Sequence, residues 1–152
     1  MDYILLDTCI VLHLLRNKDI GERAKQAIHD FSEAPAIVLS VVTKGELEAL
    51  SVQQNWGEAR KKKLNAFLED TTFIDLSHTD EALIEAYARS DGYSKQKATD
   101  KQGNYLSGAH RTMHKNDLWI AATSFILEIP LLTSDGDFDH LNGTLLNVMK
   151  VV

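Results

Sequence analysis

The sequence predicts a single α/β domain in which helices flank a central sheet of parallel strands on both faces, giving three layers. A length of 152 residues fits one domain. The composition, 44% hydrophobic and 25% charged, is ordinary for a globular protein. Short apolar runs also alternate along the chain with helical patterns, a rhythm typical of parallel sheets. No repeat or low-complexity tract divides residues 1–152.

The first half of the chain alternates apolar runs with helical patterns. The run YILL at residues 3–6 has no charged residue before Asp7, as expected for a strand buried on both faces. Similar runs predict strands at 36–40 and 72–76. Apolar residues at helical spacing predict the intervening helices over residues 9–17, 20–32, 40–54 and 58–70.

The second half contains a long segment without periodicity. A helix is predicted over residues 80–90, with Thr79 as its cap. Residues 91–114 then show no pattern and are rich in Gly, Ser, Lys and Gln, which predicts an inserted connection of a length that is often functional. The remaining elements are a strongly apolar helix and two strands, at residues 116–128, 130–134 and 144–151.

Charge and cysteine content limit the classes of function. The net charge of −6 argues against tight non-specific binding of duplex nucleic acid through a broad basic face. Residues 91–115 differ from the rest, with five basic residues against two acidic ones. A single cysteine, Cys9, cannot form an intrachain disulfide, and the apolar stretch 118–127 is shorter than the about 20 residues that span a bilayer. We therefore expect a cytoplasmic protein with no membrane association.

Five acidic residues lie just after predicted strands or in the first turns of predicted helices. Asp7 ends the first strand, and Asp135 and Asp137 follow the strand at 130–134. Glu46 lies in the helix after the second strand, and Asp117 opens the helix that leads back to the sheet. Because ligands of open α/β sheets bind at the carboxyl ends of the strands, these side chains are expected to face one crevice. Clustered carboxylates repel unless a cation lies among them, and hard oxygen ligands favour Mg²⁺ or Mn²⁺.

Each acid also has a purely structural interpretation, and the sequence leaves these open. Thr43 and Glu46 have the spacing of a capping box. Asp117 is favoured at a helix N-terminus by the helix dipole alone, and Asp7 could be an N-cap. Residues 134–137 would form a good turn.

Three other kinds of site fit the sequence poorly. The aspartates at 135–139 imitate the start of a calcium-binding EF-hand loop, but the sixth position is His140 instead of Gly. His110 and His114 have helical spacing but lack the HExxH glutamate of a zinc site. A phosphatase of the haloacid dehalogenase class would need an acid at position 9, where this chain has Cys9.

Four segments in this order resemble the four motifs of the PIN-domain family, in particular the VapC-like toxins of bacterial toxin–antitoxin pairs: LLDTCIVLHLL, LSVVTKGELEAL, KNDLWIAAT and LLTSDGDFDHL. The resemblance implies a PIN-like fold and an Mg²⁺- or Mn²⁺-dependent endoribonuclease. It assigns the catalytic and metal-binding acids to Asp7, Glu46, Asp117 and Asp135, with Asp137 as a further ligand. Supporting roles fall to Thr8 and Thr133, which would fix the site, and to Asn116, which would cap the helix that presents Asp117.

The same resemblance implies partners. These are an RNA substrate, a small antitoxin that inserts a segment into the acidic groove, and a second copy of the chain in a homodimer. The alternative is a PIN-like module that binds RNA or protein without cutting. Cys9 departs from the Asn or Ser often found there, and the 91–114 connection is longer than usual. Residues expected to contact RNA are Lys44, Tyr93, Lys95, Lys97, Lys101, Tyr105, Arg111 and Lys115.

Overall fold

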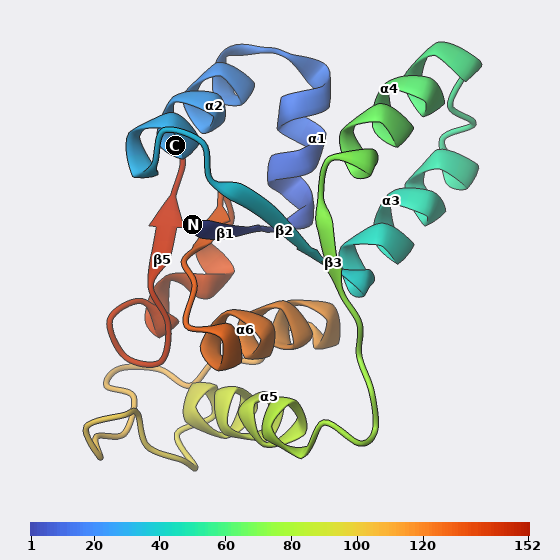
Figure 1. Cartoon of the computed structure of the whole chain (residues 1–152). Helices are drawn as coiled ribbons and strands as arrows, with labels where there is room; N and C mark the ends of the chain where they lie inside the picture. The colour runs from blue at the N-terminus through green and yellow to red at the C-terminus, as the bar shows by residue number, and fades with distance from the viewer.

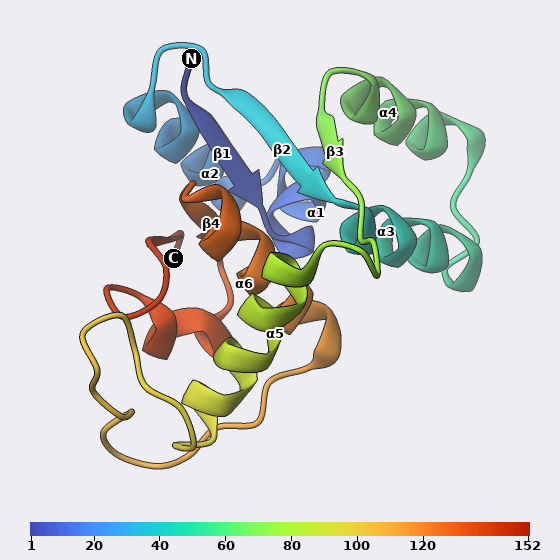
Figure 2. The same cartoon turned by 60° about the horizontal axis from the view of Figure 1, so that its bottom comes forward.

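The computed structural model describes residues 1–152 and contains one five-stranded sheet. All strands are parallel, and their order is β3–β2–β1–β4–β5 (Figures 1 and 2). The predicted parallel α/β sheet is confirmed. The strands are β1 (Tyr3–Leu6), β2 (Ala36–Ser40), β3 (Thr72–Ile74), β4 (Leu131–Thr133) and β5 (Val148–Lys150).

Helices cover both faces of the sheet, as predicted. Four of them share one apolar core cluster with the sheet: α1 (Thr8–Arg16), α2 (Asp19–Phe31), α3 (Val41–Gln53) and α4 (Glu58–Glu69). On the opposite face, α6 (Lys115–Leu127) packs against the sheet and α5 (Glu81–Ser94) packs against α6 (Figure 1). None of the helices is both long enough and apolar enough to cross a membrane.

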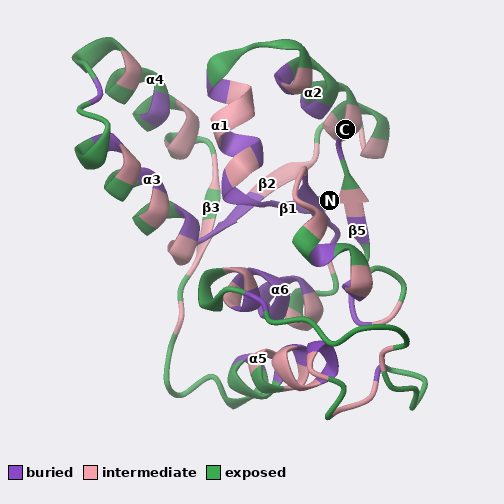
Figure 3. Ribbon diagram, turned by 180° about the vertical axis from the view of Figure 1, so that it is seen from behind, coloured by how far each residue is buried: buried purple, intermediate pink, exposed green.

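Alternating side chains of the central strand supply both cores. Ile4 and Leu6 of β1 belong to the cluster beneath α1–α4, whereas Leu5 belongs to the cluster beneath α6. All three are fully buried, which explains why the strand has no polar residue between Tyr3 and Asp7 (Figure 3). The chain therefore first becomes polar at the carboxyl end of β1.

Two of the predicted elements have clearly different boundaries in the structure, and one short helix was not predicted. Helix α5 continues to Ser94, four residues into the segment that was predicted to be irregular, because Tyr93 and Ser94 are buried there. The last strand is only three residues long and begins at Val148, not 144. Between β4 and β5 the chain forms a 3₁₀ helix, η1 (Gly136–Leu141), which the sequence patterns did not indicate.

Helices α1 and α2 are in close contact at Gly21. A Cβ at this position would overlap the backbone carbonyl of His13. That carbonyl also accepts a hydrogen bond from Asn17, which ends α1 in the left-handed conformation. The close packing of the two helices therefore depends on the missing side chain.

Gly21→Ala is expected to lower the free energy of unfolding by about 1–3 kcal/mol, because the helices must separate. Gly45→Ala in α3 is the matched control. Its Cβ would meet no atom within 4 Å, so it should stabilise the protein by about 0.5–1 kcal/mol through helix propensity alone. Urea unfolding measures both changes. Equal shifts for the two variants would contradict the packing interpretation.

Candidate metal centre

The strand order reverses at β1, between β1 and β4. The chain runs outward from β1 through β2 to β3, and later returns to the other side of β1 as β4 and β5. Such a switch point opens a crevice at the carboxyl ends of the two strands. Asp7 follows β1 directly, and Asp135 follows β4 by two residues. The N-terminus of α6, which carries Asp117, lies at the same edge because α6 runs back toward the start of β4.

Asp7 is held in place by three donors. Its Oδ1 accepts a hydrogen bond from the backbone N–H of Thr8 at 2.8 Å. Its Oδ2 accepts from the hydroxyl of Thr133 at 2.8 Å and from the thiol of Cys9 at 3.3 Å. Burial raises the pKa of the Asp7 carboxyl, and these hydrogen bonds oppose the increase. A carboxylate has about four lone-pair sites, and the three donors occupy three of them. About one site therefore remains, on Oδ1, for another ligand.

Thr133 links the two strands. Its side chain is fully buried, and while its hydroxyl donates to Asp7 it also accepts a hydrogen bond from the N–H of Asp135 at 3.0 Å. Asp135 in turn accepts from the N–H of Asp137 at 2.9 Å and thereby caps η1. One hydroxyl thus sets the relative positions of the acids that follow β1 and β4.

Thr8 links Asp7 to helix α3. Its hydroxyl donates to Glu46 Oε1 at 2.9 Å and lies 3.0 Å from the hydroxyl of Thr43. Its backbone N–H donates to the carboxylate of Asp7, the N-cap of α1. Glu46 therefore faces the same crevice as Asp7, although 38 residues separate Thr8 from Glu46.

Asp117 lies near the two acids that follow β4. One carboxylate oxygen from each of Asp117, Asp135 and Asp137 can be chosen so that all three lie within 4.8 Å of one another. Burial raises the pKa of Asp117 to about 7, and the charge of Asp7 is the next cause, followed by those of Asp135, Glu46 and Asp137. All five sequence-predicted acids are thus brought to one place, while their roles as ligands remain predictions.

None of the five acids forms an ion pair with a protein cation. The four ion pairs of the structure join other residues. The charges of the neighbouring carboxylates raise the pKa of Asp117, which fits a bound cation, and the set offers only hard oxygen donors. The residues present therefore suit Mg²⁺ or Mn²⁺ better than a softer metal.

The structural interpretations of these acids are partly correct. Asp7 is the N-cap of α1, and Asp135 caps η1. The capping box is wrong, because α3 begins at Val41 with Ser40 as its N-cap, so Thr43 already lies inside the helix. Glu46 therefore has no capping role, and its only hydrogen bond comes from Thr8.

Sequence reasoning noted Cys9 near Asp7 but missed its two polar partners and its bond to the carboxylate. Cys9 Sγ accepts a hydrogen bond from the hydroxyl of Ser134 at 3.2 Å, and that hydroxyl lies 3.2 Å from His13 Nε2. Burial, followed by the charge of Asp7, raises the pKa of Cys9, so the thiol keeps its proton. Burial, followed by Arg16, lowers the pKa of His13. Only the position of Cys9, two residues after Asp7, could have indicated this group.

A pocket of about 590 Å³ opens beside the acids, between α3 and the start of α6. Glu46 and Asp117 line one part of it, and the segment Met113–Asn116 lines the rest. The expected cap role of Asn116 is wrong. Helix α6 begins at Lys115 with His114 as its N-cap, so Asn116 is already helical and lies in the pocket wall instead.

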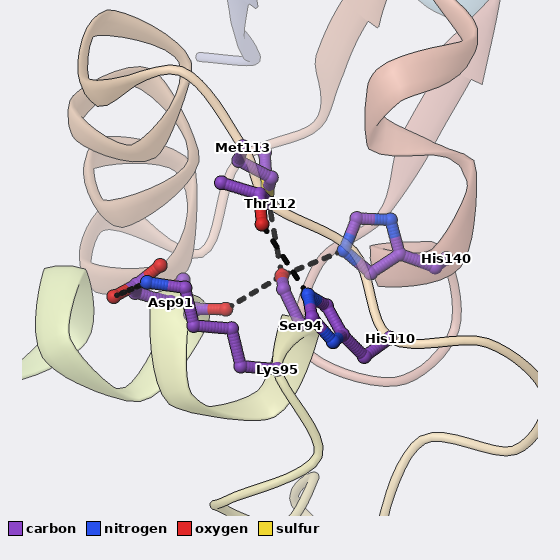
Figure 4. A network of polar contacts seen from close by, with 8 residues as sticks. Asp91, Ser94, Lys95, His110, Thr112, Met113 and His140 are labelled. Atoms are coloured by element: carbon purple, nitrogen blue, oxygen red, sulfur yellow. Dashed lines mark hydrogen bonds and ion pairs between the residues drawn. The ribbon is translucent and has the colours of Figure 1, made fainter.

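The irregular segment 95–114 is anchored beside η1. Ser94, at the end of α5, has its hydroxyl 2.7 Å from His140 Nε2 and 3.4 Å from Met113 Sδ (Figure 4). The backbone N–H of Arg111 donates to the carbonyl of Ser94 at 2.7 Å. Burial and the nearby Arg111 lower the pKa of His140. This network holds both ends of the segment together and places Arg111 near His140.

The residues expected to contact RNA are scattered. The prediction that Tyr93 stacks on a base is wrong, because this residue is only 3% exposed and packs in the core. Lys44 lies over the ring of Phe73, and residues two apart on a helix do not share a face, so it is not beside Glu46. Lys101 lies over Phe125, about 12 Å along α6 from Asp117.

The other basic residues differ in their surroundings. Lys95 pairs with Asp91 at 3.1 Å on the same helix end, and Lys97 is exposed. Lys115 lines the pocket beside Asp117, and Tyr105 is 62% exposed on the irregular segment. Of these residues, only Lys115 therefore lines the pocket beside the acids.

Comparisons with known proteins agree with this architecture. The family model described as PIN domain matches residues 4–143. No curated protein sequence matches the chain. Among solved structures, VapBC2 from Rickettsia felis bound to a promoter DNA fragment is similar, with a TM-score of 0.70 and 18% identity over 96% of this chain and 98% of that one.

Two further solved structures are similar in fold. One is VapBC-1 from nontypeable Haemophilus influenzae, with a TM-score of 0.64 and 22% identity over 99% of this chain and 98% of that one. The other is VapC20 from Mycobacterium tuberculosis, a toxin that cleaves the sarcin–ricin loop, with a TM-score of 0.61 and 16% identity over 91% and 95% of the two chains. At these identities the likeness shows the fold.

Proposed function

The chain belongs to the PIN-domain family, and from that premise we propose that it is a divalent-metal-dependent endoribonuclease, the toxin of a toxin–antitoxin pair. One observation carries the proposal. Five carboxylates from four separate segments meet at the switch point of the sheet, and no lysine or arginine pairs with any of them. Such an arrangement is costly for folding unless a cation is bound, which marks it as a functional site.

The acids would share the ion according to their positions. Asp7 and Asp117 are the first candidates for direct ligands, and Glu46 and Asp135 would hold metal-bound waters or a second ion. Asp137, with an oxygen within 4.8 Å of those of Asp117 and Asp135, is a further candidate. The chemistry that Mg²⁺ or Mn²⁺ supplies there is polarisation of the phosphodiester and activation of water. Thr133 and Thr8 orient the carboxylates through the hydrogen bonds described above. Hydrolysis would leave a 5′-phosphate and a 3′-hydroxyl.

Substrate binding is assigned to the pocket beside the acids. Lys115 lines it, and Arg111 precedes Met113 of the pocket wall by two residues, with its backbone N–H bonded to Ser94. Both cations can bind backbone phosphates, and the exposed ring of Tyr105 is available for stacking on an unpaired base. Single-stranded RNA suits this arrangement better than a duplex, because the chain has no broad basic face.

The expected protein partner is an antitoxin. Several structures similar in fold are toxin–antitoxin complexes, some of them bound to DNA. A basic side chain of such a partner, most naturally Arg, would pair with the exposed carboxylates and block the site. DNA binding would then belong to the partner, in keeping with the acidic character of this chain.

The proposal is tested by incubating a mixed RNA pool with the purified chain in Mg²⁺, Mn²⁺ or EDTA. Wild type is expected to cleave only with metal. Asp7→Asn should lose about 10²–10³-fold of the rate, because the site loses one of its preorganised charges. Asp70 is exposed and lies just before β3, at the amino ends of the strands, whereas the acids lie at their carboxyl ends. Asp70→Asn should therefore cleave RNA like wild type.

Two outcomes would contradict the proposal. Equal cleavage by wild type and Asp7→Asn would assign the activity to a different centre or a contaminant. Mn²⁺ binding without any cleavage of RNA would instead favour the alternative, a module that binds RNA or protein without cutting.

A further inference from the structure

Behind Asp7, three side chains form a continuous line of hydrogen bonds. His13 Nε2 lies 3.2 Å from Ser134 Oγ, and this hydroxyl lies 3.2 Å from Cys9 Sγ. The thiol of Cys9 is 3.3 Å from Asp7 Oδ2. Two members come from α1 and one from the residue after β4, so the line crosses the switch point of the sheet.

The donors of this line all point toward Asp7. The Asp7 carboxylate can only accept, so the thiol of Cys9 donates to it. The hydroxyl of Ser134 donates to Cys9 Sγ, and its N–H also lies 3.5 Å from the same sulfur. Because a hydroxyl has one proton, this line requires the His13 tautomer with its proton on Nε2, which then donates to Ser134. Each donor thus strengthens the next one.

The thiol has one other neighbour, the hydroxyl of Thr133 at 3.7 Å. That contact is longer, and the Thr133 hydroxyl already donates to Asp7 Oδ2 and accepts from the N–H of Asp135. The proton of Cys9 is therefore directed to the carboxylate. Together, Cys9 and Thr133 occupy both lone pairs of Oδ2. Oδ1 accepts only the N–H of Thr8, so it is the oxygen that keeps a lone pair for a ligand.

We propose that Cys9 is a positioning residue of the metal centre: its thiol, backed by Ser134 and His13, fixes the orientation of the Asp7 carboxylate. This inference rests on the proposed function, because it assumes that Asp7 binds a divalent cation. Groups that hold a metal ligand from behind affect metal affinity nearly as strongly as the ligands do. Position 9, two residues after Asp7, where Cys9 replaces the usual Asn or Ser, then has a defined role.

The test measures Mn²⁺ affinity by titration, followed by the electron paramagnetic resonance signal of the free ion, under reducing conditions. Cys9→Ala removes the donor and is expected to weaken Mn²⁺ binding by about 10-fold. Cys9→Ser keeps a donor of similar size and should restore most of the affinity. Ser134→Ala removes the group behind the thiol and should fall between wild type and Cys9→Ala.

Ser124→Ala is the matched control. It also removes a buried hydroxyl with a hydrogen bond, here to the carbonyl of Ile129 after α6, but this hydroxyl belongs to the other end of that helix from the acids. Its Mn²⁺ affinity should equal that of wild type. Melting temperatures of all variants show whether any loss of binding follows a general loss of stability.

Several results would overturn the inference. Unchanged Mn²⁺ affinity in Cys9→Ala would show that the thiol does not position Asp7, and equal losses in Cys9→Ala and Cys9→Ser would assign the effect to packing. Absence of Mn²⁺ binding by wild type would remove its premise and overturn it too. If wild type binds Mn²⁺ and the series behaves as expected, but RNA stays intact, the proposed nuclease fails while this inference stands.

Discussion

Asparagine in place of Asp117 is expected to reduce metal-dependent RNA cleavage by about 10²–10³-fold and, in the absence of metal, to make the protein less sensitive to rising pH. The first effect follows from the position of Asp117 among Asp135 and Asp137, with carboxylate oxygens within 4.8 Å. The amide is almost the same size as the carboxylate but brings no negative charge to the ion. The second effect follows from the crowding of the acids.

The pH dependence has a definite sign. The pKa of Asp117 is raised from its ordinary value of 3.8 to about 7, by burial and by the charge of Asp7 before the other acids. A raised pKa of an acid in the folded state favours folding at low pH. Its contribution is complete below about pH 3.8 and is lost as the pH rises through about 7. Without metal, wild type should therefore become less stable over this range, and Asp117→Asn should not.

The size of this effect is limited by solvent. Asp117 is only half-buried, so screening reduces the contribution to about 1 kcal/mol, equivalent to about 2–4 °C in melting temperature. Asparagine also loses about 0.3–1 kcal/mol of favourable interaction with the N-terminus of α6. The informative quantity is thus the difference in melting temperature between wild type and Asp117→Asn, and how this difference changes from pH 5 to pH 8.

Thermal melting with and without Mn²⁺, together with the cleavage assay, checks both effects. Mn²⁺ should raise the melting temperature of wild type at pH 8 and have little effect on Asp117→Asn. Asp139→Asn is the control in the same region, since Asp139 pairs with Lys150 and is not among the charges that raise the pKa of Asp117. Parallel pH curves for wild type and Asp117→Asn would show that the acids do not repel one another in the folded protein.

The gathering of the acids could be predicted because it follows from topology. Once residues 3–6 and 130–134 are recognised as parallel strands, Asp7 and Asp135 must emerge at the same edge of the sheet. The helix over 116–128 must return to the start of the last of these strands, which places Asp117 there as well. This part of the prediction needs only the order and direction of elements.

The parts that could not be predicted depend on contacts between distant residues. Ser134 and Cys9 are 125 positions apart, and no local pattern indicates that a thiol and a hydroxyl will meet. The burial of Tyr93 likewise follows from its packing beneath Met113 and Phe138, which no periodicity in residues 91–114 reveals. The role of Asn116 was misjudged by the position of one helix start, because a side chain already inside the first turn cannot act as the N-cap.

Thr133→Val is expected to weaken Mn²⁺ binding by about 10–100-fold and to lower the free energy of unfolding by about 1–3 kcal/mol. Valine has nearly the shape of threonine, so the change removes the hydroxyl with little change in volume. The carboxylate of Asp7 would lose its shortest side-chain donor, at 2.8 Å, and the N–H of Asp135 would lose its acceptor at 3.0 Å. Both acids would then be free to move apart.

Thr123→Val in α6 provides the comparison that isolates this effect. Its hydroxyl is also buried, but it donates to the carbonyl of Trp119 one turn earlier in the same helix, a local bond that joins no two segments. We expect a small loss of stability and unchanged Mn²⁺ affinity. If Thr133→Val bound Mn²⁺ as tightly as Thr123→Val, the backbone alone would position Asp7 and Asp135. In that case the cation, when bound, would draw the acids together, and the hydrogen bonds around them would serve folding only.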